Sequence, residues 1–134
     1  MVIPIVAAAL PYRQRDGCYE ILLVRSTSGR WIIPKGQSEA GEATFQAAQR
    51  EAWEEAGVRG DIEELPYAAF DYHGSDKVQH VLVHPLLVRE TLPTWPEQKT
   101  RPQMWVPATA LPANVPPELA GIIADFAEEF CPTP

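Results

Sequence analysis

Cysteine is scarce in this 134-residue sequence, which contains only Cys18 and Cys131. The two lie far apart and form no Cys-x-x-Cys pair, so free thiols are the expected state, with one disulfide as the alternative. Basic residues are also few, since 11 Lys and Arg face 18 Asp and Glu, for a formal net charge of −7. This acidic balance argues against a general nucleic-acid or membrane surface. Anionic substrates would have to be held locally, by a metal ion and a few basic side chains.

The sequence has no hydrophobic run long enough to span a membrane. The apolar segment at positions 1–10 lacks a basic flank, contains Pro4 and is too short to span a membrane. We interpret Val2 to Leu10 as a buried strand, followed by a polar turn from Pro11 to Gly17. Without a targeting or transmembrane segment, a cytoplasmic protein with no membrane partner is expected. No repeat, low-complexity tract or linker divides the sequence, and its length fits a single domain, residues 1–134.

One segment near the middle of the sequence predicts a helix, from about Ala43 to Ala56. Good helix formers fill it, Thr44 is a plausible N-cap, and Gly57 is well placed to end it in the left-handed conformation. At 100° per residue, three carboxylates share one face of this helix, those of Glu51, Glu54 and Glu55.

These carboxylates repel one another and lie in the last helical turn, where the helix dipole disfavours anions. Each effect costs from a few tenths to about 1 kcal/mol. Arg50 can offset only part of this cost, so a bound cation is the economical interpretation. Hard oxygen ligands suit Mg²⁺, with Mn²⁺ as a substitute. A solvated acidic face is the alternative.

The helix belongs to a longer pattern that resembles the Nudix box, Gly-x5-Glu-x7-Arg-Glu-U-x-Glu-Glu-x-Gly-U, where U is usually bulky and aliphatic. Ala52 is smaller than usual at the first U position, which should affect packing more than chemistry. Every fixed position matches, namely Gly36, Glu42, Arg50, Glu51, Glu54, Glu55 and Gly57.

The order of the other expected elements also resembles the Nudix fold. A second strand is expected at Tyr19 to Arg25 and a long strand at Val78 to Arg89, where Pro85 suggests an edge position or a bulge. A terminal helix is expected from Pro116 to about Phe130. Strands interleaved with two helices indicate an α/β fold, the Nudix α/β/α sandwich with a mixed β-sheet between helices.

The resemblance implies a Mg²⁺-dependent hydrolase that cleaves the phosphoric anhydride bond of a diphosphate linkage. The implied metal ligands are the carboxylates of Glu51, Glu54 and Glu55 and the backbone carbonyl of Gly36. One of these carboxylates doubles as the general base, and the sequence does not decide which; Glu51 and Glu54 are our candidates. Arg50 is also expected among the catalytic residues. Its expected role is to hold a neighbouring carboxylate rather than to touch the substrate. Glu42 is expected either to orient the loop or to bind a second metal ion.

Segments outside the box resemble one branch of the family, the diadenosine polyphosphate and diphosphoinositol polyphosphate hydrolases. These are the run from Arg30 to Gly36 and the later Trp95-Pro96-Glu97, with Arg101 and Trp105. The sequence departs from that branch at Lys35 and Gln37, where Pro-Gly-Gly-Gly is frequent.

Basic side chains near these segments are candidates for contacts with a polyphosphate. A lysine beside the metal could bind a terminal phosphate as a point charge, and an exposed lysine is the alternative. The candidates are Lys35, Arg30, Arg25 and Arg101, with Lys77 as a further one. Glu97 is a candidate additional metal ligand or base, whereas Trp95 and the three histidines are interpreted as structural.

Two other functions compete with this interpretation. The first is a house-cleaning pyrophosphatase that acts on non-standard or oxidised nucleoside triphosphates. The second is a non-catalytic module that binds a nucleotide, which the intact set of three glutamates argues against. Tight binding of RNA is not expected, because the sequence has no basic stripe. The family often forms homodimers, but no residue here identifies an interface.

Overall fold

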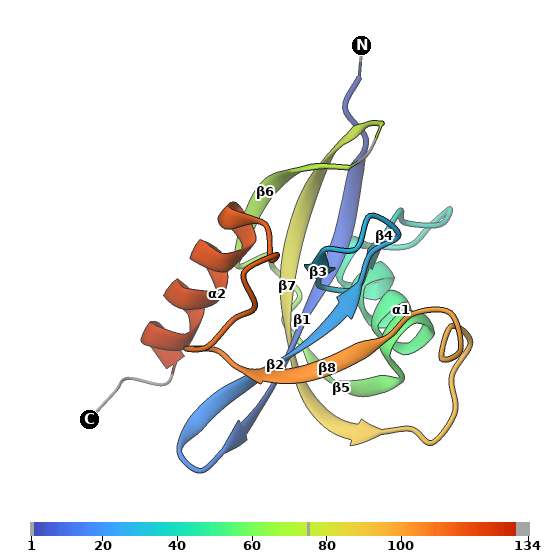
Figure 1. Ribbon diagram of the computed structural model, residues 1–134. Helices are drawn as coiled ribbons and strands as arrows, with labels where there is room; N and C mark the ends of the chain where they lie inside the picture. The colour runs from blue at the N-terminus through green and yellow to red at the C-terminus, as the bar shows by residue number, and fades with distance from the viewer. Residues whose placement is uncertain (1, 75, 131–134) are drawn as a thin grey trace.

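The computed structural model describes residues 2–74 and 76–130 of the chain. Within them, eight strands form one mixed sheet that lies between two helices (Figure 1). In chain order the elements are β1 (Ile5–Arg15), β2 (Cys18–Arg25), β3 (Trp31–Ile32), β4 (Lys35–Gly36), α1 (Thr44–Ala56), β5 (Val58–Ile62), β6 (Ala68–His73), β7 (Val78–Thr91), β8 (Gln103–Pro107) and α2 (Pro117–Phe130). This arrangement confirms the α/β/α sandwich predicted from the sequence.

The two longest strands, β1 and β7, run parallel to each other at the centre of the sheet. On one side β1 pairs antiparallel with β2 and with the short β4, and β2 continues the sheet to β3 and β8. On the other side β7 pairs antiparallel with β5 and β6. The short strand β4 therefore lies beside β1, on one side of the central pair, and β6 lies beside β7, on the other side.

The first strand differs from the sequence-based expectation at both of its ends. Val2 is 90% exposed, and the strand begins only at Ile5. The expected turn from Pro11 to Gly17 was wrong, because β1 continues to Arg15. Pairing with β7 and β2 keeps these polar residues extended, and the chain reverses only where Asp16 and Gly17 adopt φ angles of 53° and 79°.

Pro85 was expected at a sheet edge or a bulge, and this expectation was wrong. It lies within β7, opposite Leu10 of the neighbouring β1. Its carbonyl accepts a hydrogen bond from the amide of Glu63, in the connection between β5 and β6. The missing N–H of Pro85 faces the same connection, where neither strand continues the ladder. The irregularity in this part of the sheet falls instead between Arg59 and Gly60 of β5.

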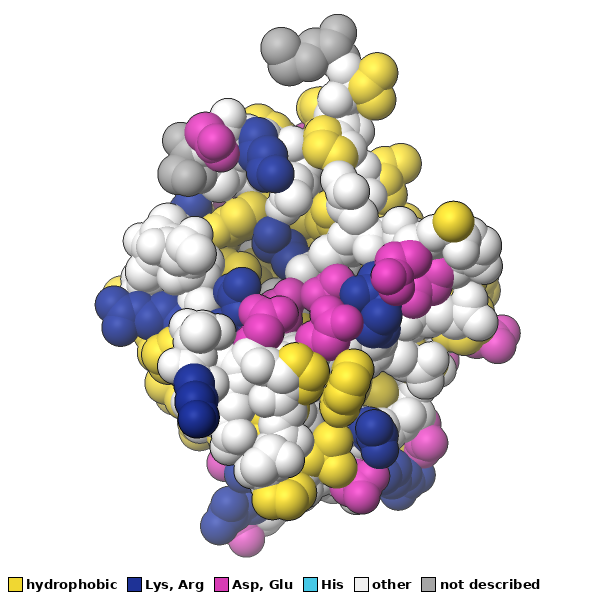
Figure 2. All heavy atoms as spheres, turned by 90° about the vertical axis from the view of Figure 1, so that its right-hand side faces the viewer, with side chains coloured by type: hydrophobic (Ala, Val, Ile, Leu, Met, Phe, Trp, Pro, Cys, Tyr) yellow, Lys and Arg dark blue, Asp and Glu magenta, His cyan; other side chains and the backbone are white. Residues whose placement is uncertain are grey.

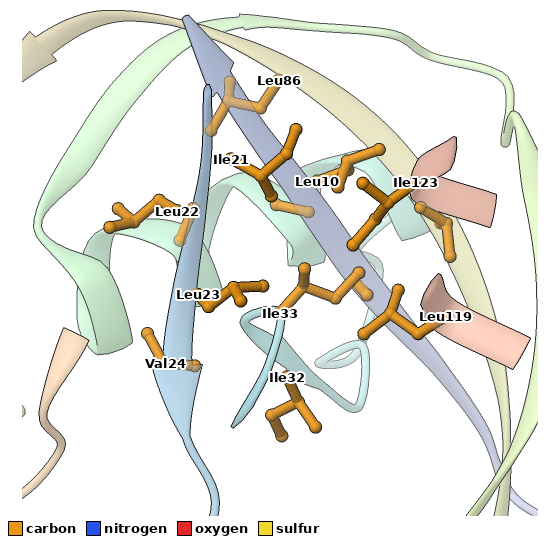
Figure 3. Packing of buried hydrophobic residues seen from close by; sticks show 14 of the residues in the cluster. Leu10, Ile21, Leu22, Leu23, Val24, Ile32, Ile33, Leu86, Leu119 and Ile123 are labelled. Atoms are coloured by element: carbon orange, nitrogen blue, oxygen red, sulfur yellow. The ribbon is translucent and has the colours of Figure 1, made fainter. Parts of the chain in front are cut away.

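Large aliphatic side chains from both central and flanking strands form the core. Figure 3 shows labelled members of this cluster from β1, β2, the segment around β3, β7 and α2. Leu119 and Ile123 of α2 are fully buried against it, and Phe126 packs its ring near Tyr12, with ring centres 4.9 Å apart. Helix α2 thus covers one side of the sheet with bulky apolar side chains.

Helix α2 is the last element of the described chain. Helix α2 begins at Pro117, and the carbonyl of Pro116 accepts the first helical hydrogen bond, so the predicted helix is confirmed to within one residue. No helix of the described residues is long and apolar enough to cross a membrane. Cys18 is an exposed free thiol, and the expectation for Cys131 lies outside the described residues.

Candidate functional site

Small side chains bring α1 close to the sheet. The helix buries the alanines Ala47, Ala48, Ala52 and Ala56, and its main neighbour β1 contributes a run of buried alanines at positions 7–9. Helix α1 also packs on β4, where Gly36 pairs with Ala7. A Cβ atom at Gly36 would lie 2.2 Å from Glu51 Oε2, so only glycine leaves room for that carboxylate. Close packing therefore sets Glu51 directly against the backbone of β4.

Both ends of α1 are fixed by specific contacts. The N-cap is Ala43, whose amide donates to Gln46 Oε1 at 2.8 Å, so the expectation of Thr44 as N-cap was wrong. Thr44 Oγ1 instead bonds His84 Nε2 at 3.0 Å, and His84 Nδ1 lies 2.8 Å from the Glu63 carbonyl. At the other end Gly57 is left-handed, with φ 67°, as the sequence predicted.

Arg50 connects the loop before α1 to the carboxylates of the helix. Its guanidinium donates to both oxygens of Glu42 at 3.0 Å and to the Gln37 carbonyl at 3.0 Å. The same side chain reaches Glu51 Oε2 at 2.9 Å and Glu54 Oε2 at 3.4 Å. The hydrogen bonds from Arg50 to Glu42 hold the pKa of the Glu42 carboxyl below its ordinary value. Arg50 thus ties Glu42 of the loop to the helix carboxylates, and the roles of both residues in the reaction stay predictions.

The three helix carboxylates differ in exposure. Glu51 and Glu55 are buried, with 8% and 5% of their surfaces exposed, whereas Glu54 is partly exposed. Burial, followed by a hydrogen bond with Glu51, raises the pKa of the Glu55 carboxyl from 4.5 to about 9. Burial and the Glu51 charge also raise the pKa of Glu54. The raised pKa of Glu55 reflects the cost of placing its charge in a buried position beside another carboxylate.

The chemistry of these groups fits a divalent cation. Buried carboxylates without a full complement of positive charge are costly unless paired or bound to metal, and their oxygens are the ligands that Mg²⁺ prefers. In the described part of the chain, however, no three Asp, Glu, His or Cys side chains are already arranged to hold an ion. Arg50 lies against two of the carboxylates instead. Metal ligation by Gly36, Glu51, Glu54 and Glu55 therefore stays a prediction.

The segment between β7 and β8 is anchored on the C-terminal end of α1. The amide of Leu92 donates to the Gly57 carbonyl at 2.8 Å, and the amide of Glu97 donates to the Glu54 carbonyl at 2.9 Å. The Trp95 ring packs so closely on Gly57 that a Cβ there would lie 2.3 Å from it, which confirms Trp95 as a loop anchor. This segment places Glu97 beside the helix carboxylates.

Arg101, from the same segment, joins the carboxylates to a neighbouring cavity. Its Nε lies 3.1 Å from Glu97 Oε1 and 3.9 Å from Glu55 Oε1. Figure 2 shows the group of acidic side chains with Lys and Arg side chains beside it. The cavity has a volume of about 280 Å³, and its lining includes Ser28, Lys35, Tyr72, Lys77, Gln79 and Arg101.

The basic candidates from the sequence do not all reach this cavity. Lys35 and Arg101 line it, and burial lowers the pKa of the Lys35 ammonium group. Arg30 lies over the Tyr72 ring, 4.9 Å from its centre, and donates to the His73 carbonyl. Arg25 is exposed on an adjoining cavity, which Arg101 also lines. Lys77 lines the cavity as well, so three of the five basic candidates lie at it and two lie on its periphery.

Sequence reasoning missed two residues of this cavity, Tyr72 and Gln79. They stand directly opposite each other in the β6–β7 hairpin. The residues face the same side of the sheet because paired positions share a face. Assigning the register of that hairpin from the sequence would have identified both.

Comparisons with known proteins agree with this architecture. A family model described as the NUDIX domain matches residues 3–126. "Nudix hydrolase 18, mitochondrial" of Arabidopsis thaliana is 35% identical over 111 residues, covering 75% of this chain and 62% of the relative. "Nudix hydrolase 16, mitochondrial" of the same plant is 34% identical over 120 residues, covering 76% of this chain and 67% of the relative. The chain thus spans about 62% of the length of the first of these relatives.

Solved structures share the fold. A Caenorhabditis elegans Ap4A hydrolase in a binary complex superposes with a TM-score of 0.75 at 23% identity, over 95% of this chain and 97% of that one. The NUDIX domain of a Shewanella oneidensis protein, complexed with ADP ribose, gives a TM-score of 0.74 at 16% identity, over 96% and 89% of the two chains. At these identities the likeness extends to the fold alone.

Proposed function

Because this chain belongs to the Nudix family, we propose that it is a Mg²⁺-dependent pyrophosphohydrolase that cleaves a diphosphate linkage in a nucleoside or inositol polyphosphate. One observation carries the proposal. Glu51, Glu54 and Glu55 share one helix face, with Glu51 against Gly36, and a cavity with lysine and arginine side chains adjoins them. Acidic groups for a cation and basic groups for an anion thus lie next to each other.

In the proposed site, the three carboxylates bind the metal ion and neighbouring residues hold them in place. Glu51, Glu54, Glu55 and the Gly36 carbonyl would hold Mg²⁺, or Mn²⁺ in its place. A bound divalent ion neutralises phosphate oxygens and lowers the pKa of a coordinated water. Glu51 or Glu54 would accept the proton of that water, and Arg50 would keep their carboxylates oriented.

The substrate would extend from the carboxylates into the basic cavity. Lys35 and Arg101 would contact its phosphates, with Arg30 and Arg25 contributing charge from the periphery. Glu97 lies close enough to Arg101 and to the helix carboxylates to serve as an additional metal ligand or base. The proposed substrate class is the diadenosine or diphosphoinositol polyphosphates, and one structural neighbour is named an Ap4A hydrolase.

A product analysis tests this function. The purified protein is incubated with Mg²⁺ and diadenosine polyphosphates, a diphosphoinositol phosphate, ADP-ribose or nucleoside triphosphates, and the products are separated by ion-exchange chromatography. We expect cleavage of a long polyphosphate, with turnover lowered about 10²-fold or more in Glu55→Gln. Glu128→Gln, an exposed glutamate of α2, is the matched control.

Other outcomes of this assay would redirect the proposal. Release of pyrophosphate from triphosphates would move the protein to the house-cleaning class. Binding of nucleotides without any turnover would leave a non-catalytic module. Full turnover in Glu55→Gln would contradict the proposed metal site. A cytoplasmic location and a homodimer stay predictions, and the plant relatives are themselves named mitochondrial.

A further inference from the structure

Another cavity lies between helix α1 and strand β5. Its volume is about 460 Å³, which is larger than that of the cavity beside the carboxylates and within the range of about 300–1,000 Å³ typical of small-molecule sites. Its lining includes Gln49, Trp53, Val58, Arg59 and Leu86. At 100° per residue, Gln49 and Trp53 lie on a different face of α1 from the three carboxylates. The cavity is therefore separate from the one that the proposed function uses.

The lining of this cavity carries positive side chains and no negative ones. Its charged members are Arg50 and Arg59, in a chain whose net charge is −7. The guanidinium of Arg50 is already bound by carboxylates. Arg59 is exposed and forms no ion pair within the described part of the chain, although Glu90 is its partner in the β5–β7 ladder. Arg59 is therefore available to an anionic group.

The side chain of Arg59 lies over the Trp53 ring at a distance that suits an inserted ring. Its Cζ is 5.9 Å from the ring centre, compared with 3.9 Å for Arg13 over Trp105. Carbon atoms in contact are about 3.5–4.0 Å apart, so a flat ring between the two groups needs about 7 Å. An exposed arginine can move outward by this difference. The pair thus fits a planar aromatic ring stacked on the indole.

The backbone around the cavity is fixed. The pairing of β5 with β7 shifts its register between Arg59 and Gly60, and such a bulge changes the direction of the neighbouring side chains. A Cβ atom at Gly60 would collide with the Leu87 carbonyl oxygen, so this bulge needs glycine. Val58 and Leu86 are buried and give the cavity an apolar part. The charged and the aromatic side chains therefore stand on rigid elements.

We propose that this cavity binds a planar aromatic anion, with the ring on Trp53 and the carboxylate or phosphate group at Arg59. Gln49 is exposed and makes no side-chain hydrogen bond with the described residues, so its amide is available to polar atoms of the ligand. The inference is independent of the proposed function, because none of the three carboxylates lines this cavity.

Nuclear magnetic resonance of the indole N–H groups tests the site. The isotope-labelled full chain, in the presence of a chelator, is titrated with indoleacetate and adenosine monophosphate, and with their neutral counterparts indoleacetamide and adenosine. Trp53→Phe identifies the Trp53 signal among those of the four tryptophans. We expect an anion to shift this signal and to bind at least about tenfold more tightly than its neutral counterpart, because the neutral compound loses a charge-assisted contact.

The results also distinguish the sources of the anion. Tighter binding of indoleacetate indicates a carboxylate ligand, and tighter binding of adenosine monophosphate indicates a phosphate ligand. If neither anion shifts the Trp53 signal at millimolar concentration, the site is wrong. Equal affinities for the charged and neutral compounds would also overturn it.

Three variants assign the anion to this cavity. Arg59→Met should abolish the tenfold preference for the anion, whereas Arg15→Met, which changes an exposed arginine outside the cavity, should preserve it. Lys35→Met should preserve it as well, because Lys35 lines the cavity beside the carboxylates. Loss of the preference in Lys35→Met but not in Arg59→Met would place the anion in that other cavity and contradict the inference. Such a failure would leave the proposed hydrolysis unaffected.

Discussion

The two helices that cover the sheet bury different kinds of side chain. Helix α2 buries Leu119, Ile123 and Phe126, which are among the largest fully buried residues of the described chain. Helix α1 buries four alanines and, beside them, the carboxylates of Glu51 and Glu55. Bulky side chains gain more from burial, about 1.5–3 kcal/mol each. We infer that α2 chiefly stabilises the fold, whereas α1 gives up packing energy to position charged groups.

Electrostatics sharpens the same contrast. The first turn of α2 carries Glu118, where the helix dipole favours an anion. Helix α1 has no acidic residue in its first turn and none of its last-turn residues is basic, while Glu54 and Glu55 stand at the unfavourable end. Helix α2 also ends without a basic residue, but its last-turn carboxylates Glu128 and Glu129 are exposed to solvent, whereas that of Glu55 in α1 is buried. Buried like charges at an unfavourable helix end are expected where a bound ligand compensates them.

The largest expected effect comes from removing the central aromatic side chain of α2. Phe126 packs among Tyr12, Tyr19 and Tyr67, with ring centres 4.9, 5.7 and 5.4 Å away. Phe126→Ala should lower the free energy of unfolding by about 3–5 kcal/mol, as measured by urea denaturation. The affinity of the folded protein for Mg²⁺ should stay unchanged. A marked loss of metal affinity in the folded state would contradict the division between the helices.

A smaller effect is expected from enlarging the close contact of α1. Ala52 is fully buried, so Ala52→Leu should cost about 1–3 kcal/mol of stability through overpacking. It should also weaken Mg²⁺ binding, because the helix must move away from β4. Ala124→Leu makes the same change at an exposed position of α2 and is the control. If Ala52→Leu lost stability but bound the ion normally, close packing would not be what positions the carboxylates.

The smallest effects should have opposite signs on the two helices. Glu118→Gln removes a favourable charge from α2 and should cost about 0.3–1 kcal/mol. Glu55→Gln removes an unfavourable buried carboxyl from α1 and should stabilise the metal-free protein by about 1 kcal/mol. Thermal unfolding in the presence of a chelator measures both. Destabilisation by Glu55→Gln under these conditions would show that the Glu55 carboxyl does not destabilise the protein without its ligand.

The effect of Glu55→Gln should also depend on pH. The pKa of Glu55 is raised in the folded state, so the stability that this carboxyl contributes is present below pH 4.5 and is lost as pH rises toward about 9. The metal-free wild type should therefore lose stability across this range, and Glu55→Gln should lose less. Parallel pH profiles for the two proteins would contradict the raised pKa.

Local patterns predicted α1 and its cluster, whereas contacts distant in sequence decided what was missed. The end of α1 at Gly57 and the shared face of its glutamates follow from helix geometry alone. The extension of β1 past Pro11 depends on pairing with β7 as far as Tyr12 and with β2 from Tyr12 to Arg15. The central place of Pro85 depends on where β5 and β6 end. The cavity beside the carboxylates was missed because finding it needs both the register of the β6–β7 hairpin and the contact of Lys35 with Gln79, which lies far away in the sequence.

Direct measurement of Mn²⁺ binding tests the central claim, that the α1 carboxylates form a site for a divalent ion. Electron paramagnetic resonance of free Mn²⁺ reports the bound fraction for wild type, Glu51→Gln and Glu128→Gln. We expect wild type and Glu128→Gln to bind the ion alike, and Glu51→Gln to bind it at least about tenfold more weakly, since a charged ligand is lost. Equal binding by all three proteins would contradict the site.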